Sequence, residues 1–183
     1  DCDALKEIDI PNKVNSIGQK AFYDCDALTK IIIPDSVTSL GAYAFYGCET
    51  LESADLGNSI MLLGAGAFTG CDKLTEIYIP DTVTNIEMKA FKNCSTLHTV
   101  RMSPNVDYIP REAFYNCKEL SVFTWDSESK LVGRLAFGNC VKLTDFDFVN
   151  VEKLYVNSFL GSGVNVVQLG ETENESSRTP LTT

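Results

Sequence analysis

The chain has 183 residues, a formal net charge of -10 and a hydrophobic share of 44 %. This is the composition of an ordinary folded protein, and no apolar run approaches the roughly 18–20 residues of a membrane span. The acidic balance disfavours nucleic-acid binding, because phosphate backbones are themselves negative. A single histidine, His98, excludes most histidine-based catalysis and most zinc chemistry.

A period of 23 residues runs through nearly the whole chain. It is marked by one cysteine in each unit, at Cys2, Cys25, Cys48, Cys71, Cys94, Cys117 and Cys140. Each cysteine is followed three residues later by a leucine, and an Ala-Phe pair such as Ala44-Phe45 recurs later in the unit. One unit of this length cannot bury its own apolar edge, so the repeat predicts a solenoid of stacked coils.

The first predicted element of each coil is a short strand. Its mark is an apolar pair six and eight residues after the cysteine, and this period of two indicates one buried face. In chain order the pairs are Ile8/Ile10, Ile31/Ile33, Ala54/Leu56, Ile77/Ile79, Val100/Met102, Phe123/Trp125 and Phe146/Phe148, with an eighth, shortened rung at Val164, Val167 and Leu169. Successive strands are expected to pair in parallel, with the aromatic side chains in the core.

The rest of each coil is predicted to return to the next strand through a second wall and one short helical turn. Apolar residues such as Val37 and Leu40 follow the strand and should line the opposite wall, and the Ala-Phe pair should lie in the helical turn. The residue before each cysteine is Asp1, Asp24, Gly47, Gly70, Asn93, Asn116 or Asn139. All are types that tolerate the left-handed backbone of a helix C-cap.

The arrangement C-x-x-L-x-x-I-x-I-P…V-x-x-I-G-x-x-A-F-x-x-C resembles the BspA-type, or Treponema-type, leucine-rich repeat. The clearest copies run from Cys25 to Cys48 and from Cys71 to Cys94, and the resemblance covers residues 1–170. It implies an α/β fold: a right-handed solenoid of about seven to eight coils, with the parallel sheet on its concave face. It also implies an extracellular or cell-surface bacterial protein, associated with adhesion and with binding host or microbial proteins, and no family-wide catalytic residue.

The two ends depart from the repeat. The chain opens at Asp1-Cys2, inside a unit, so we expect a piece of a longer protein whose N-terminal cap and export signal precede it. Residues 171–183 are polar, and this composition predicts a disordered extension or linker.

The cysteines have three possible roles: disulfides, metal ligands or a packed column. Their odd number and identical place in every coil argue against disulfides, because the Cβ vectors of stacked coils run parallel. No two cysteines lie closer than 23 residues, which argues against a metal site. We therefore predict a buried column of free thiols.

No catalytic, cofactor-binding or metal-binding residue is predicted. The glycine-rich stretch at residues 64–70 superficially suggests a phosphate loop, but its spacing fits neither known pattern. Asp145 with Asp147, and Glu7 with Asp9, place two carboxylates on one strand face, which could serve a cation or a glycosidic acid/base pair. In the absence of a pocket signal, we interpret both pairs as a solvated face.

The candidate binding surface is the outward side of the strands, where residues vary from coil to coil while the inward positions stay apolar. The candidate ligand-binding residues are Ile32, Asp55, Glu76, Tyr78, Arg101, Val122 and Thr124. Tyr78 with Arg101 is the predicted contact point, because both types are enriched among interface anchors.

Three classes of function remain open from the sequence. The first is a non-enzymatic module that binds a protein or a surface glycan, with the acidic charge favouring a basic or neutral partner. The second is a structural spacer in a larger surface protein. The third is an accessory domain that positions a separate catalytic domain of a secreted enzyme.

Overall fold

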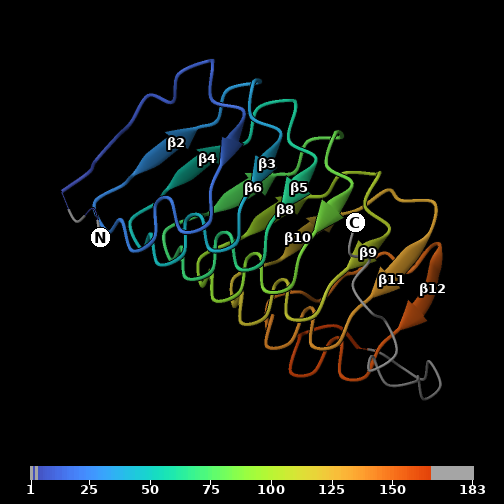
Figure 1. Ribbon diagram of the computed structural model, residues 1–183. Helices are drawn as coiled ribbons and strands as arrows, with labels where there is room; N and C mark the ends of the chain where they lie inside the picture. Colours follow the sequence, from blue (N-terminus) through green and yellow to red (C-terminus); the bar gives the residue numbers. More distant parts are fainter. Residues whose placement is uncertain (1, 3, 166–183) are drawn as a thin grey trace.

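The structure is a computed structural model that describes residues 2 and 4–165. Within this range the chain winds into stacked coils that carry two rows of short strands (Figure 1). The predicted eighth rung at Val167 and Leu169, the left-handed residue expected at Asp1 and the tail of residues 171–183 lie outside the described residues. Val164 lies within them and packs half-buried against the core.

The first strand row contains the first residue of five predicted apolar pairs, and the second residue of each pair directly follows its strand. Its strands are β2 (Lys30–Ile32), β4 (Ser53–Asp55), β6 (Glu76–Tyr78), β8 (Thr99–Arg101) and β10 (Val122–Thr124). All pairing is parallel and advances by one repeat, so that Ile77 lies opposite Val100. The period of two is confirmed, since Ile31 and Ile33 are buried and Ile32 between them is exposed. The end pairs Ile8/Ile10 and Phe146/Phe148 are not in strands, and each belongs to a coil at one end of the described stack.

A second strand row forms the opposite wall, where the sequence predicts only an apolar lining. Its strands are β1 (Ser16–Ile17), β3 (Ser39–Leu40), β5 (Leu62–Leu63), β7 (Asn85–Ile86), β9 (Tyr108–Ile109), β11 (Lys130–Val132) and β12 (Val151–Leu154). Neither row is one continuous sheet. Hydrogen bonding breaks between β4 and β6 in the first row and between β7 and β9 in the second.

A column of phenylalanines fills the space between the two rows. It runs through Phe22, Phe45, Phe68, Phe91, Phe114, Phe137 and Phe159, with adjacent ring centroids 5.0–5.5 Å apart and the rings nearly parallel. Near the C-terminal end Phe123 and Phe146 pack on this column. Trp125 is buried and its Nε1 donates to the carbonyl of Val106. The prediction that these aromatics belong to the core is confirmed.

The predicted helical turn is not confirmed, because no residue in the described part of the chain is helical. In the second coil Ala44 and Tyr46 donate to carbonyls three residues earlier, as a turn requires. The amides that precede these two, at Tyr43 and Phe45, donate instead to carbonyls of the next coil, at 2.8 and 2.7 Å. Alternate amides therefore bond between coils, which ties the stack together and prevents a helix.

Each turn segment contains two left-handed residues, of which the sequence predicts one. The predicted position before the cysteine has positive φ at Asp24, Gly47, Gly70, Asn93, Asn116 and Asn139. A second position, four residues earlier, has positive φ at Lys20, Tyr43, Gly66, Lys89, Glu112 and Leu135. Only one of these six residues, Gly66, is a glycine. The other five hold a left-handed backbone conformation that costs an L-residue about 1–2 kcal/mol.

The cysteine column is confirmed from Cys25 to Cys140: these six thiols are free and buried. Cys2 is exposed, contrary to the prediction, because it lies at the open end of the stack. The thiols do more than fill space. From Cys48 onward each Sγ donates to the carbonyl of the phenylalanine 26 residues earlier, at 3.1–3.3 Å, as Cys94 does to Phe68.

Thiol labelling tests this column. The reactive species is the thiolate, and burial raises the pKa of the Cys48 and Cys140 thiols to about 12. We therefore expect Ellman's reagent at pH 8 to label Cys2 rapidly in the native protein and the other six thiols only after unfolding in guanidinium. Rapid labelling of several thiols in the native protein would contradict the buried column.

Candidate functional site

The first strand row positions all seven candidate binding residues on one exposed face. Glu76 and Val122 begin β6 and β10, whereas the other five residues end their strands: Ile32, Asp55, Tyr78, Arg101 and Thr124. This placement follows because successive side chains of a strand point to opposite faces. The middle residue of each strand faces the core, so its first and last residues face outward. The face is the one that the sequence resemblance predicts to be concave.

Tyr78 and Arg101 contact each other at the centre of this face. The two are register partners of β6 and β8, and the guanidinium carbon of Arg101 lies 4.4 Å from the centroid of the Tyr78 ring. Arg101 also lies 3.9 Å from a carboxylate oxygen of Asp81, which is exposed. The Tyr78 side chain remains 53 % exposed. The pair therefore presents a preformed aromatic and cationic surface to solvent.

A shallow hollow of about 440 Å³ lies beside this pair, over β4, β6 and β8. It brings together Asp55, Glu76, Tyr78 and Arg101 of the predicted residues, but not Ile32, Val122 or Thr124. Ala54 lies in its floor, where the adjacent coils carry Ile31 and Ile77. The hollow coincides with the break in hydrogen bonding between β4 and β6. The sequence offers one signal for it, the short side chain of Ala54.

The hollow also includes polar residues that sequence reasoning misses. Ser53, Asn58 and Thr99 contribute hydroxyl and amide groups to its lining. The Asp55 carboxylate accepts a hydrogen bond from the Gly57 amide at 3.0 Å, which orients it at the rim. Carboxylates, an arginine, hydroxyls and an aromatic ring thus face one depression. This mixture is suited to recognition by shape and hydrogen bonding.

His98 is exposed and contacts two hydroxyls that the sequence analysis does not identify. Ser121 Oγ lies 2.9 Å from His98 Nε2, and Thr99 Oγ1 lies 3.0 Å from His98 Nδ1. In a Ser-His-Asp triad a carboxylate orients the imidazole, whereas here the Thr99 hydroxyl contacts His98 Nδ1. The contact between Ser121 and His98 follows from the repeat, because Ser121 occupies the equivalent position in the next coil.

In the Asp145/Asp147 pair, Asp147 forms an ion pair with a buried lysine. Asp147 Oδ2 lies 2.9 Å from the buried Lys130 Nζ, and Asp147 Oδ1 accepts a hydrogen bond from the Val149 amide. The Val149 bond and then the Lys130 contacts hold the pKa of the Asp147 carboxyl below its usual range. The Lys130 ammonium also lies 5.8 Å from the Trp125 ring. Asp147 therefore helps to neutralise a buried lysine.

In residues 2 and 4–165, no three His, Cys, Asp or Glu side chains gather closely enough to hold a metal ion. The same part of the chain forms no helix of the length and apolarity needed to cross a bilayer.

Parallel coils of 23 residues with thiol and phenylalanine columns define a solenoid of the leucine-rich-repeat class. A profile of the BspA-type leucine-rich repeat region matches six copies, over residues 1–120 and 63–176. The chain belongs to this family. No curated protein matches it significantly.

Solved structures of bacterial proteins share this fold. A leucine-rich cell surface protein from Faecalibacterium prausnitzii is 36 % identical, with a TM-score of 0.62 over 63 % of this chain and 31 % of that protein. A leucine-rich-repeat protein of T. pallidum is 26 % identical, with a TM-score of 0.60 over 72 % of each chain. The pneumococcal vaccine antigen PcpA, 16 % identical with a TM-score of 0.53 over 86 % of this chain and 40 % of that one, shares the fold alone. The chain thus spans about a third of the F. prausnitzii protein.

Proposed function

We propose that the chain is a non-enzymatic recognition module of a bacterial cell-surface or secreted protein, and that it binds a protein partner through the first strand row. The observation that carries the proposal is the Tyr78–Arg101 pair beside the hollow over β4, β6 and β8. Tyrosine and arginine are the residue types that most often dominate the energy of protein interfaces. Ile32 and Val122 extend the same face with exposed apolar side chains.

The rigidity of the coil stack supports binding on a preformed surface. Backbone amides at the ends of the strands bond to the next coil, as Ile79 does to Arg101 and Met102 to Thr124, each at 2.8 Å. The face is therefore preformed, and binding costs little conformational entropy of the backbone. The description of the similar F. prausnitzii protein as a leucine-rich cell surface protein supports the proposed location.

Replacing the central pair tests the proposed face. A photo-crosslinker at position 78 would identify the partner, and Tyr78→Ala and Arg101→Ala would then be compared with the wild type by calorimetry. Each truncation is expected to weaken binding by roughly 1–2 kcal/mol, about five- to thirtyfold in Kd, because each removes a central anchor. Met61→Ala is the matched control, since Met61 is also 53 % exposed and adjoins β5 of the second row.

Two results would contradict the proposal. Unchanged affinity in both variants would remove this face as the binding surface. An equal loss in Met61→Ala would indicate a general effect of truncation. A chain that binds nothing through any face would instead be a structural spacer or an accessory to a catalytic domain.

A further inference from the structure

The turn segments form a second hollow, of about 600 Å³, whose lining is basic and aromatic. It spans four coils and includes three lysines, Lys20, Lys89 and Lys92, and three tyrosines, Tyr23, Tyr43 and Tyr46. Its volume lies within the roughly 300–1,000 Å³ of small-molecule sites. Among the residues that the structure describes, no carboxylate lines it. In a chain with a net charge of -10, three ammonium groups around one depression are a marked local reversal of charge.

The tyrosines form an ordered aromatic wall between the lysines. The Tyr23 and Tyr46 rings stack with centroids 4.8 Å apart, and Tyr43 meets Tyr46 edge-on at 5.9 Å. Burial, together with the neighbouring charge of Asp24, raises the pKa of the Tyr23 hydroxyl. Lys20 Nζ lies 5.0 Å from the Tyr23 ring at one end of the wall.

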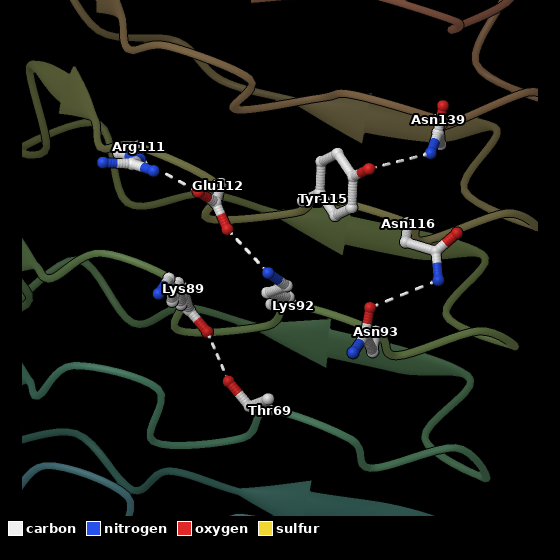
Figure 2. A network of polar contacts seen from close by, with 9 residues as sticks. All are labelled: Thr69, Lys89, Lys92, Asn93, Arg111, Glu112, Tyr115, Asn116 and Asn139. Carbon is white, nitrogen blue, oxygen red and sulfur yellow. Dashed lines mark hydrogen bonds and ion pairs between the residues drawn. The ribbon is translucent and has the colours of Figure 1, made fainter.

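The lysine at the far end of the hollow is fixed by its neighbours, as Figure 2 shows. Lys92 Nζ contacts Glu112 Oε2 at 2.7 Å, and Arg111 Nε contacts Glu112 Oε1 at 2.9 Å. Although burial opposes ionisation, these two cations lower the pKa of the Glu112 carboxyl. One carboxylate thus faces two cations. For Lys20 and Lys89 no ion pair is seen within the part of the chain that the structure describes.

The backbone conformation of the turn segments places three of the lining side chains at equivalent positions of their coils. Lys20, Tyr43 and Lys89 all belong to the second left-handed column, with φ of 57°, 59° and 63°. Gly66 occupies the same column between Tyr43 and Lys89, so the position accepts a glycine without strain. A Cβ at Gly66 would come within 2.7 Å of the Tyr43 ring, which shows that this ring lies over the glycine.

We propose that this turn-face hollow binds an acidic glycan, an oligosaccharide that carries carboxylate or sulfate groups. Lys20 and Lys89 lie three coils apart, about 14 Å at the usual strand spacing, and would take two negative groups. Of the tyrosines between them, Tyr43 is the one that is not stacked face to face on another ring, and its negative π face would attract the C–H groups of a sugar ring. This site lies on the turn segments and is distinct from the first strand row.

An acidic peptide fits the hollow less well because the backbone of its walls is already paired. The amides of Lys20, Tyr43, Lys89 and Asn93 all donate to carbonyls of the next coil, at 2.8–3.1 Å. The Thr69 hydroxyl donates to the Lys89 carbonyl at 2.7 Å (Figure 2). A peptide strand would find no free edge for β-addition. The available groups are ring faces, hydroxyls and ammonium groups, which suit a charged sugar.

Calorimetry at low salt with defined oligosaccharides tests the inference. The probes are a hyaluronan hexasaccharide, which carries carboxylates, a heparin hexasaccharide, which also carries sulfates, neutral maltohexaose and hexaglutamate. We expect one or both acidic sugars to bind, and the stronger of them identifies the preferred anionic group. The Kd should rise at least tenfold in Lys20→Gln/Lys89→Gln and in Tyr43→Ala. The matched control Lys73→Gln/Lys118→Gln removes two exposed charges outside the hollow and should bind as the wild type does.

Several outcomes would overturn the inference. One is that neither acidic sugar binds the wild type. Another is that Lys20→Gln/Lys89→Gln and its control bind the sugar with equal Kd. A third is that hexaglutamate binds as tightly as the sugars. Circular dichroism confirms that each variant is folded. Tyr78→Ala/Arg101→Ala should leave sugar binding unchanged. If that variant instead lost sugar binding, the ligand would lie on the first strand row, which would refute the turn-face site without refuting the proposed function.

Discussion

Ile77→Asp is expected to destabilise the chain by about 4 kcal/mol or more, whereas Tyr78→Asp should cost less than about 1 kcal/mol. The two positions are adjacent in β6, but Ile77 is 3 % exposed and Tyr78 is 53 % exposed. Aspartate at position 77 would place a charge between stacked coils, opposite Val100, with no partner there. At position 78 the same residue stays in water and loses only the contact with Arg101.

Urea unfolding followed by circular dichroism measures both variants. Ile77→Asp should lower the midpoint strongly or prevent folding, and in the latter case Ile77→Ala, with an expected loss of about 2–5 kcal/mol, keeps the test quantitative. Similar losses at positions 77 and 78 would mean that the assignment of inward and outward positions is wrong. That result would also remove the basis for the binding face.

The second large effect is expected at the centre of the phenylalanine column. Phe91 is fully buried and stacks on Phe68 and Phe114, each at a centroid distance of 5.4 Å. Phe91→Ala should cost about 3–5 kcal/mol, because it removes a large apolar side chain and leaves a cavity between two coils. The free energy of unfolding from urea titrations gives the loss.

Phe22→Ala is the matched control for Phe91→Ala. Phe22 belongs to the same column but is half-buried at its N-terminal end and stacks on Phe45 alone. Its replacement should cost markedly less than that of Phe91. An equal loss at the two positions would indicate that stability does not depend on a continuous ring stack.

The features that depend on one coil were predictable from the sequence. The period of two at Ile31 and Ile33, the buried thiols from Cys25 onward and the left-handed residue before each of these six cysteines all follow from residue type and position. They recur because equivalent residues of every coil pack in the same way against the neighbouring coils. An internal repeat therefore supplies the sequence signal that an isolated unit lacks.

The features that depend on contacts between coils were not predictable. The predicted helical turn is not seen, because backbone amides such as that of Phe45 donate to carbonyls of the next coil instead of their own. The Cys94 thiol donates to Phe68 across one coil boundary, which a small apolar filler would not do. The turn-face hollow depends on Gly66 leaving room for the Tyr43 ring of the preceding coil. No single unit contains this information.

Hydroxyl-radical footprinting of the chain, alone and bound to a partner captured on the immobilised protein, tests the proposed recognition face most directly. Tyr78, Met61 and Met88 are 53 %, 53 % and 51 % exposed, so all three should be oxidised in the free chain. The account predicts that the partner protects Tyr78 and leaves Met61 and Met88, which adjoin the second strand row, unprotected. Protection of Met61 and Met88 with Tyr78 still oxidised would contradict it.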